Sequence, residues 1–540
     1  MSYTSFNFML FLGVTVLAYF LFPVKKYQWT VLLAASYVFY LIAGYRYAAY
    51  ILFTTITTYS AALWMDRIAR QAKAVLDANK TQWDRQQKKD FKNQTRQRKR
   101  LILIAALVVN FGILVFLKYY PFVAGSLNDV LGIFRIRFSA PTLKLILPLG
   151  ISFYTFQSMG YAVDVYREKI AAERNLGKVA LFVSFFPQIV QGPISFYDQL
   201  AHQLYAPHRL EFTRCKHGCE LILWGFFKKL VIADRAVTAI DAVLENYADY
   251  NGAILLFTVL LYALHLYADF SGGIDISRGV AQILGIDLAE NFKRPYFATS
   301  INDYWRRWHI TLGAWMKNYV FYPLALSKGF ANAGKKLKAT CFGKTEFGAH
   351  VAKVLPTSFA SLIVFLLVGV WHGAGGKYIA FGLWNGGVIM LSTLLEPLFG
   401  KLTTRLRLNV RSWWYRVFQM LRTFVIVLVG YVFDIAPSFR AAMGTFRRIL
   451  TDQNLWEARQ QLAAMKLDGY DYGLLAVCTG ILFTVSVIQE RNSGDTIRNM
   501  LDRRPFAVRY LVLLAGIMMV LLFGIYGPDF DAAQFVYMQF

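Results

Sequence analysis

The sequence predicts an all-α, polytopic integral membrane protein with about 11–13 transmembrane or re-entrant helices around a central funnel or tunnel. Two observations on composition support this fold class: 56% of the 540 residues are hydrophobic with only 17% charged, and the mean hydropathy is +0.40. A soluble globular protein typically has about 25% charged residues. The composition therefore excludes a soluble enzyme and a disordered protein, and four cysteines give no disulfide framework.

The third observation is a series of apolar runs, most of them near the roughly 20 residues that cross about 30 Å of hydrocarbon. Several runs are short enough to be re-entrant. No basic region precedes the first run and Lys25 and Lys26 follow it, so this run is expected to remain as an uncleaved span. The predicted spans are 1–24, 29–44, 47–65, 101–120, 142–163, 179–195, 218–240, 251–270, 356–372, 377–395, 412–435, 471–489 and 505–526.

Basic residues lie between the apolar runs, which explains the net charge of +26 without a nucleic-acid partner. The largest interruption, 66–100, has twelve Lys and Arg against four acids and predicts a solvated cytoplasmic helical hairpin that also suits anionic lipid headgroups. A second basic loop is 326–355, and arginines cluster near 405–416 and 491–504. With these segments inside, we expect a multi-pass protein of the cell (inner) membrane whose N-terminus and C-terminus, including Asp529, Asp531 and Phe540, lie outside.

Three stretches carry polar residues where the bilayer makes polarity expensive, and such residues usually mark function. In the first, 147–157, Ser152, Thr155 and Gln157 either line a polar cavity or form hydrogen bonds between helices, and Gln157 is a candidate substrate-binding residue. The nearby segment 185–194 has two prolines and a glycine. These residues predict a broken or re-entrant element.

The second stretch, 267–278, follows a long apolar run that ends at Asp269. Gly272 and Gly273 are expected to break the helix, and Asp275 and Arg278 are spaced to pair across one turn. A re-entrant loop held by an internal ion pair is favoured over a catalytic carboxylate. Asp269 remains a candidate substrate-binding residue.

The third stretch, 291–324, is too polar to cross lipid unprotected and too aromatic for a solvated loop. It is expected to pack into a cavity or to lie along the cytoplasmic interface. At helical spacing one face carries Trp305, Trp308, His309 and Trp315, and Arg306 and Arg307 point elsewhere. The guanidinium groups of these arginines suit phosphates. The candidate substrate-binding residues here are Trp305, Arg306, Arg307 and Trp308.

The sharpest pattern follows the run 356–372, which ends in Trp371-His372-Gly373. A lone histidine is structural by default, but two of the seven histidines, His309 and His372, lie in unusual polar and aromatic membrane segments. A buried neutral imidazole is an effective general base near pH 7. We therefore predict His372 and His309 as catalytic residues, with Trp371 and Asn385 as candidates for substrate binding.

Taken in order, these segments resemble the membrane-bound O-acyltransferase family. The similarity is to its bacterial branch, which contains the alginate O-acetyltransferase membrane subunit and the teichoic-acid D-alanyl transfer protein. The matching motifs are Leu-Pro-Leu-Gly-Ile-Ser-Phe-Tyr-Thr-Phe-Gln at 147–157, Phe-Phe-Pro-Gln-Ile-Val-Gln-Gly-Pro-Ile at 185–194, Asp-Phe-Ser-Gly at 269–272, Glu-Asn-Phe-Lys-Arg-Pro-Tyr at 290–296, Tyr-Trp-Arg-Arg-Trp-His-Ile at 304–310 and Val-Trp-His-Gly at 370–373.

The resemblance implies one membrane-embedded acyltransferase domain over 1–540, with the basic cytoplasmic loop 66–100, the core motifs at 145–390 and C-terminal helices at 400–540. It makes His372 the catalytic histidine and His309 the second signature histidine. It implies an acyltransferase for groups other than aminoacyl groups, which passes an acyl group from a cytoplasmic thioester to an extracytoplasmic polysaccharide, and the expected group is acetyl. The expected donor substrate is acetyl-CoA or an acyl carrier protein, with no bound cofactor. The expected partners are the lipid bilayer and an extracytoplasmic or membrane-anchored acyltransferase.

Two alternatives remain open at this point. One is D-alanyl transfer from a carrier protein to teichoic acid, and the other is a glycan transporter or flippase, which would show inverted repeats that this sequence lacks. A metal site is not expected, because Cys215, His217 and Cys219 supply only three ligands and do not share a helical face.

Overall fold

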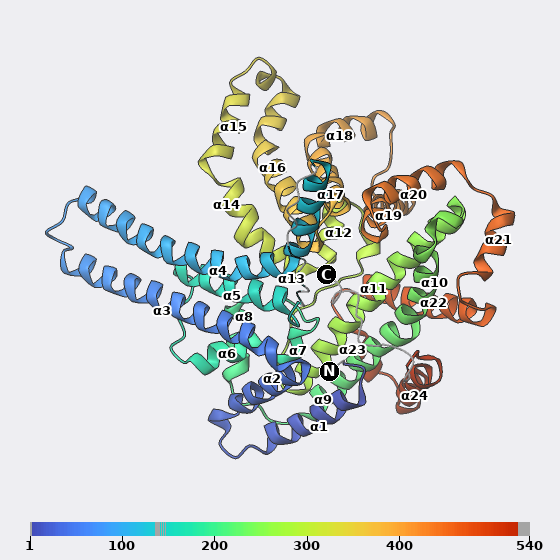
Figure 1. Ribbon diagram of the computed structural model, residues 1–540, viewed down its shortest axis with the longest axis horizontal. Helices are drawn as coiled ribbons and strands as arrows, with labels where there is room; N and C mark the ends of the chain where they lie inside the picture. The colour runs from blue at the N-terminus through green and yellow to red at the C-terminus, as the bar shows by residue number, and fades with distance from the viewer. Residues whose placement is uncertain (1–2, 135–140, 142, 144, 146, 527–540) are drawn as a thin grey trace. The chain divides into compact units, whose positions relative to one another are not determined.

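The computed structural model describes residues 3–134, 141, 143, 145 and 147–526 (Figure 1). Across these ranges the regular elements are α-helices with short 3-10 and π-helical turns, and the one β feature is an isolated bridge between Phe292 and Trp308. The all-α class is therefore confirmed. The predicted acidic tail with Asp529, Asp531 and Phe540 lies outside the described residues, as does part of the predicted span 142–163.

Six helices in the described chain are long and apolar enough to cross a membrane, or up to eight if each of two bent helix pairs is one span. The six are α4 (Arg85–Ile133), α11 (Gly252–Ile283), α16 (Glu346–His372), α19 (Trp413–Ile435), α22 (Gly469–Arg491) and α24 (Phe506–Phe523). The polytopic class is thus confirmed. Other predicted spans fall on interrupted helices: 179–195 is broken at Phe185, and 218–240 contains a π-helical segment.

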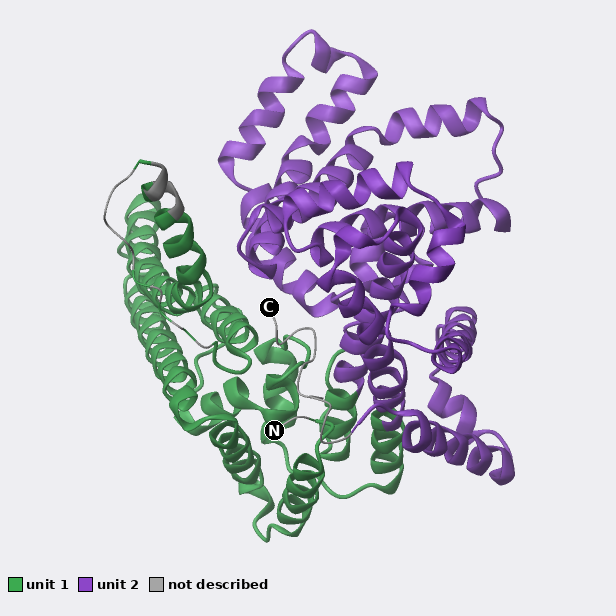
Figure 2. Cartoon of the chain, turned by 45° about the vertical axis from the view of Figure 1, so that its right-hand side comes forward, with its two compact units in different colours: residues 1–222, 276–289 green, residues 223–275, 290–540 purple. Residues whose placement is uncertain are grey.

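The chain divides into two compact units, which are described separately (Figure 2). Unit 1 contains residues 1–222 and 276–289, and unit 2 contains residues 223–275 and 290–540. Two of the three boundaries fall inside α9 and α11, and the third follows Ala289. The expectation of one acyltransferase domain over 1–540 stays a prediction.

In unit 1, the predicted charged hairpin at 66–100 is confirmed, because α3 and α4 form it and the chain turns between Ala78 and Arg85 (Figure 1). The segment 185–194 is also broken as predicted, with only one turn of helix. The helices of unit 1 besides α4 are α1 (Phe6–Leu21), η1 (Lys25–Tyr27), α2 (Trp29–Ala43), η2 (Tyr45–Tyr47), α3 (Ala48–Ala78), α5 (Ile151–Tyr166), α6 (Leu176–Ser184), α7 (Phe186–Ile189), α8 (Tyr197–Tyr205), most of α9 (Phe212–Phe226) and the end of α11.

Unit 2 contains both predicted catalytic histidines and the remaining long helices. Its shorter elements are η3 (Phe227–Ala233), α10 (Asp234–Glu245), η4 (Tyr247–Asp249), η5 (Pro295–Phe297), α12 (Ile301–Arg307), α13 (Ile310–Met316), η6 (Lys317–Phe321), α14 (Tyr322–Ala325), α15 (Lys328–Lys338), η7 (Phe342–Lys344), α17 (Gly376–Leu394), α18 (Glu396–Arg405), α20 (Phe439–Thr451), α21 (Leu455–Ala463) and α23 (Ile497–Asp502). The basic segment 326–355, predicted as a loop, is instead largely helical in α15 and the start of α16.

The predicted helix break at Gly272 and Gly273 is wrong, because α11 continues through both residues. Gly272 instead allows close packing of two helices. A Cβ atom at Gly272 would lie 2.9 Å from the carbonyl oxygen of Gly225, so only glycine lets the two backbones approach this closely. The segment 267–278 is therefore part of a long helix and not a re-entrant loop.

Close packing also joins α16 to α17, the helices on either side of His372. A Cβ atom at Gly369 would lie 2.3 Å from the carbonyl oxygen of Tyr378, and one at Gly382 would lie 2.6 Å from that of Phe365. Small residues allow membrane helices to approach in this way. The approach fixes the end of α16 against the first turns of α17.

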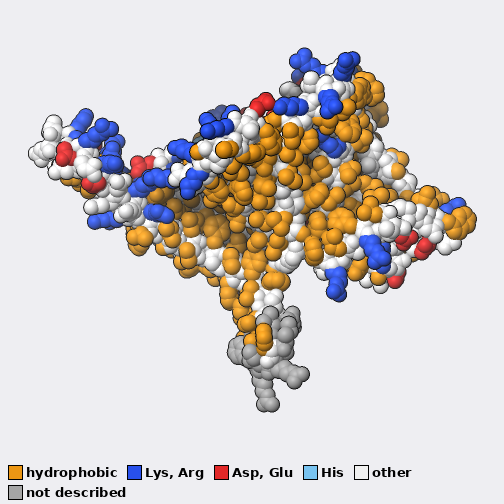
Figure 3. All heavy atoms as spheres, turned by 90° about the horizontal axis from the view of Figure 1, so that it is seen from above, with side chains coloured by type: hydrophobic (Ala, Val, Ile, Leu, Met, Phe, Trp, Pro, Cys, Tyr) orange, Lys and Arg blue, Asp and Glu red, His pale blue; other side chains and the backbone are white. Residues whose placement is uncertain are grey.

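Exposed apolar side chains fit a lipid environment. Figure 3 shows hydrophobic side chains over much of the visible face, with Lys and Arg gathered at its margin. On α24, the side chains of Leu511, Leu521 and Leu522 are 62%, 56% and 65% exposed. Water would disfavour so large an apolar surface, whereas acyl chains accept it.

Candidate active site

His372 is the last residue of α16, and the turn after it depends on glycine. A Cβ atom at Gly373 would lie 2.2 Å from ring carbon Cε2 of Tyr378. The ring centroid of His372 lies 5.2 Å from that of Trp371 and 5.2 Å from that of Phe381 on α17. The imidazole is therefore held in an aromatic environment and is largely shielded, with 16% of its side chain exposed.

One carboxylate lies beside this imidazole. Oδ1 of Asp434, near the end of α19, is 3.9 Å from Nδ1 of His372, and the aspartate side chain is 3% exposed. The hydroxyl of Tyr262 on α11 donates a hydrogen bond of 2.8 Å to Oδ2 of Asp434. Lys377 donates to the backbone carbonyl oxygens of Asp434 and Ala436, at 2.9 and 2.8 Å.

His309 lies in the turn between α12 and α13 and adopts a left-handed backbone conformation, with φ of 47° and ψ of 51°. This turn ends the helix that the spacing of Trp305, Trp308 and His309 predicted, so the three residues do not share one continuous helical face. A β-bridge supports the turn, since Ile310 N donates to Asn291 O at 3.0 Å and Lys293 N donates to Arg307 O at 2.9 Å.

A hydrogen bond to Asn291 defines the tautomer of His309. Nδ1 of His309 lies 3.3 Å from Oδ1 of Asn291, which also accepts from the backbone N and the hydroxyl of Thr311 at 3.0 and 2.9 Å. A carbonyl oxygen only accepts, so the network assigns the proton of neutral His309 to Nδ1 and the lone pair to Nε2.

The two histidines share one aromatic site. The ring of His309 meets Phe270 edge to face at 4.9 Å between centroids and lies 6.1 Å from Trp371, the residue next to His372. Burial lowers the pKa of His309 to about 3, and the charge of His372 acts in the same direction. His309 is therefore a neutral imidazole at physiological pH. The two histidines are also close enough to interact electrostatically.

Tyrosines extend the site behind the histidines. The hydroxyls of Tyr304 and Tyr431 are 2.7 Å apart, and that of Tyr296 lies 3.3 Å from Tyr431. Tyr431 also packs edge to face against Tyr262, with centroids 5.6 Å apart. The hydroxyl of Tyr262 in turn binds Asp434. These rings give the site a rigid wall with fixed hydroxyl groups.

The predicted tryptophans surround this region. Trp305 packs against Phe365 and Phe381, at 4.9 and 6.4 Å between centroids, and Phe381 also contacts His372. Trp308 is 6% exposed and stacks on Tyr304 at 5.7 Å. Trp371 lies between the two histidines in sequence and in ring contacts. All three belong to the aromatic wall.

The polar candidates from the same motifs have other contacts. Arg306 is exposed, whereas Arg307 forms ion pairs with Asp303 and Glu490, both at 3.1 Å. The side-chain amide of Asn385 is buried and donates to the carbonyl oxygen of Phe381, one turn earlier on α17. The role of these residues in binding substrate stays a prediction.

Asp269 and Gln157 lie in separate buried networks. Oδ1 of Asp269 accepts a hydrogen bond of 2.6 Å from Nζ of Lys229. Gln157 belongs to unit 1, where its amide donates to the carbonyl oxygen of Phe182 at 2.6 Å and its oxygen accepts from Gln188 at 2.9 Å. The cation beside Asp269 is thus Lys229, a residue that the sequence reading did not single out.

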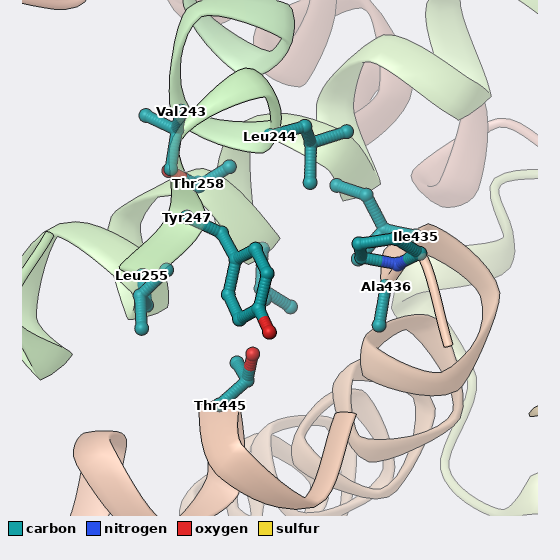
Figure 4. Close-up of a pocket in the computed structure, with 10 residues that line it drawn as sticks. Val243, Leu244, Tyr247, Leu255, Thr258, Ile435, Ala436 and Thr445 are labelled. Atoms are coloured by element: carbon teal, nitrogen blue, oxygen red, sulfur yellow. The ribbon is translucent and has the colours of Figure 1, made fainter. Parts of the chain in front are cut away.

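A small apolar pocket lies elsewhere in unit 2, between α10, α11, the end of α19 and the middle of α20 (Figure 4). Tyr247, Leu255, Ile435 and Thr445 are among its lining residues, and Tyr247 points into it. The lining offers hydroxyl groups but includes neither histidine. This pocket is therefore not the predicted acyl-transfer site.

Comparison with known proteins identifies the family. A probable alginate O-acetylase of Azotobacter vinelandii is 31% identical over 444 residues, which are 81% of this chain and 76% of that protein. The model of the membrane-bound O-acyltransferase family matches residues 168–342, which include His309. The chain belongs to the membrane-bound O-acyltransferase family. It is therefore a multi-pass membrane enzyme that transfers acyl groups.

Other relatives of this membrane-bound O-acyltransferase are named for acetyl transfer or for D-alanyl transfer. A probable alginate O-acetylase of Pseudomonas aeruginosa is 29% identical over 88% of this chain and 80% of its own length. A peptidoglycan O-acetyltransferase of Helicobacter pylori is 30% identical over 66% of each chain. A teichoic acid D-alanyltransferase of Bacillus subtilis is 26% identical over 55% of this chain and 71% of its own length.

The structure adds residues that sequence reasoning missed. Asp434 is a single carboxylate at the end of an apolar run, which is itself a signal of function, but its proximity to His372 depends on the packing of α19 against α17. Asn291 and Tyr262 contact the site through side-chain hydrogen bonds. Asn291 belongs to the motif at 290–296, whereas Tyr262 lies in an apolar run. In neither case does the local sequence indicate the partner of the side chain.

Proposed function

We propose that this membrane-bound O-acyltransferase transfers an acetyl group from a cytoplasmic thioester to a hydroxyl group of a cell-surface or exported polysaccharide. The relatives with the widest coverage support acetyl transfer, since their names are alginate O-acetylase and peptidoglycan O-acetyltransferase. The structural observation that carries the proposal is the meeting of His309 and His372 in one buried aromatic site. Family membership favours this enzyme over the transporter alternative.

In the proposed reaction His372 is the general base. Its imidazole takes the proton from the acceptor hydroxyl as the oxygen attacks the thioester carbonyl carbon. The tetrahedral intermediate then collapses, the carbon–sulfur bond breaks, and the imidazolium returns the proton to the departing thiolate. A positioned base of this kind typically accelerates a reaction by about 10²- to 10⁴-fold.

His309 is the second catalytic residue of the proposal. Because its Nδ1–H is directed to Asn291, Nε2 carries the lone pair and accepts a hydrogen bond. That geometry suits orientation of the acceptor hydroxyl better than donation to an oxyanion. Backbone N–H groups of the glycine-rich turn that follows Gly373 are the oxyanion donors of the proposal.

The donor is proposed to enter from the cytoplasmic side, to which the basic segments 66–100 and 326–355 are assigned, because acetyl-CoA carries phosphates and an acyl carrier protein is acidic. The acceptor approaches from outside, together with an extracytoplasmic or membrane-anchored acyltransferase partner. The acyl group thereby crosses the bilayer without its thiol carrier. Transfer by the reconstituted protein alone to a polysaccharide would contradict the partner requirement.

D-alanyl transfer to teichoic acid is the second candidate, supported by the similarity to a teichoic acid D-alanyltransferase of Bacillus subtilis. That similarity covers 55% of this chain, against 81% for the alginate O-acetylase of Azotobacter vinelandii. Mass analysis of surface glycans from cells with and without the gene distinguishes the candidates. Acetyl esters that depend on the gene support acetyl transfer, and D-alanyl esters support the alternative.

Variants of His372 test the mechanism. We expect His372→Gln and His372→Ala to lower glycan ester content per membrane protein by at least about 10²-fold, because neither side chain accepts the hydroxyl proton. The matched control is His350→Gln, a histidine on the same helix whose imidazole contacts the carbonyl oxygen of Thr393. Near-normal ester content with His372→Gln would remove His372 from the mechanism.

The proposed orientation places both termini outside and residues 66–100 in the cytoplasm. Cysteine substituted for Lys88, at the hairpin between α3 and α4, is expected to react only after the membrane is permeabilised. A cysteine in a tag placed after Phe540 is expected to be labelled in intact cells, without permeabilisation. Labelling of both positions from the same side would contradict this orientation.

A further inference from the structure

We propose that Asp434 is the positioning residue that orients His372 for catalysis by holding its Nδ1–H, an inference that rests on the proposed role of His372 as base. The two atoms, Nδ1 and Oδ1, are 3.9 Å apart. One residue lies at the end of α16 and the other near the end of α19. Two long helices therefore present an imidazole and a carboxylate to each other.

The carboxylate of Asp434 is fixed in place by other groups. Its Oδ2 accepts the hydroxyl of Tyr262 at 2.8 Å. Its backbone carbonyl accepts from Lys377, which also binds the carbonyl of Ala436. Among the described residues, Oδ1 accepts no hydrogen bond, although it is buried. A buried carboxylate oxygen without a donor is costly, so the geometry points to a donor that engages it during the reaction.

The imidazole of His372 is that donor. A hydrogen bond needs about 2.7–3.2 Å between nitrogen and oxygen, so the present separation must shorten by less than about 1 Å. Catalytic hydrogen bonds are often long without substrate and tighten when it binds. A donated Nδ1–H leaves the lone pair on Nε2, and the negative charge of Asp434 stabilises the imidazolium that forms after proton abstraction.

The contacts of Asp434 make Asp434→Asn a sharp perturbation. Lys377 binds the backbone carbonyl and not the side chain, so that contact survives the substitution. The asparagine oxygen still accepts the hydroxyl of Tyr262. The substitution therefore removes the charge and turns an amide N–H toward His372, which favours the tautomer with the proton on Nε2. That tautomer is unable to act as the base.

The test compares Asp434→Asn with Asp434→Glu in cells, measured as glycan ester content per membrane protein. We expect Asp434→Asn to lose about 10²- to 10⁴-fold of activity at near-normal abundance, as loss of a carboxylate beside a catalytic histidine does elsewhere. Asp434→Glu keeps the charge and reaches further, so it is expected to retain at least about 10-fold more activity than asparagine. A purely structural role predicts the opposite order, because asparagine is isosteric and glutamate is larger.

Two further variants separate the possible failures. Tyr262→Phe keeps the aromatic ring and the charge of Asp434 but removes the anchor of Oδ2, and we expect it to fold and to lose several-fold in activity. The inference is overturned if Asp434→Glu is no more active than Asp434→Asn. It is also overturned if the two single variants Tyr262→Phe and Asp434→Asn both keep wild-type activity. High activity in His372→Gln overturns the proposed function instead, whereas an inactive His372→Gln beside a fully active Asp434→Asn overturns only the role of Asp434.

Discussion

The buried cation Lys229 gives the most quantitative stability prediction. Its Nζ lies 2.7 Å from Oδ1 of Asp234 and 2.6 Å from Oδ1 of Asp269, and the three side chains are 2%, 2% and 0% exposed. Lys229→Met keeps most of the side-chain volume but removes the cation that both carboxylates contact. Both carboxylates then remain in a medium that penalises charge.

Breaking a buried ion pair by removing one partner costs about 3–5 kcal/mol. Two pairs are lost here, but uptake of a proton by one aspartate limits the additional cost, so about 3–5 kcal/mol is expected in total. The matched control is Lys466→Met, because Lys466 lies 3.1 Å from Glu245 with side chains 58% and 61% exposed. An exposed pair contributes about 0–1 kcal/mol.

The assay heats the detergent-extracted protein and follows the fraction that stays monodisperse in size-exclusion chromatography. We expect Lys229→Met to lose this fraction at a clearly lower temperature than Lys466→Met. Additional Asp234→Asn and Asp269→Asn substitutions should restore much of the loss, since they remove the uncompensated charges. Equal thermal resistance of Lys229→Met and Lys466→Met would refute the reasoning.

Two other predictions concern the site. Because burial lowers the pKa of His309 to about 3 from 6.5, the unfolded chain binds a proton that the folded chain does not between these values, and stability falls as the pH drops below about 6.5. Thermal scans at pH 7 and pH 5 should show a smaller acid-induced loss for His309→Asn than for the wild type, and an equal loss contradicts this. Gly373→Ala places a Cβ atom 2.2 Å from the ring of Tyr378, so it should lower the free energy of unfolding by about 1–3 kcal/mol and reduce the glycan ester content. The control Gly387→Ala, whose Cβ atom would have no atom within 4 Å, should match the wild type in both assays.

The sequence alone determined the membrane class, the long apolar helices and the two histidines. Hydropathy is a local property, so α16, α19, α22 and α24 begin and end within a few residues of their predicted positions, apart from the N-terminal extension of α16. His309 and His372 stood out because their neighbours in sequence are polar and aromatic within apolar surroundings. Local composition was sufficient for these conclusions.

Local propensity failed where packing decided the outcome. Gly272 and Gly273 suggested a helix break. The close approach of the Gly225 backbone instead gives Gly272 a packing role inside a continuous helix. Conversely, Trp305 to His309 suggested one helical face, but the hydrogen bonds of Asn291 and the left-handed turn at His309 divide the segment into two helices. In both cases a contact with a distant segment outweighed the preference of the local sequence.

Only the tertiary structure decided which groups surround the histidines. Asp434 and Tyr262 come from α19 and α11, and Lys229 supplies the cation beside Asp269. Buried charges and polar groups seek partners wherever helix packing brings them within about 3–4 Å, and sequence separation does not limit that choice. The physical reason is that desolvation makes an unpaired group costly, while the identity of its partner is fixed by the packing of whole helices.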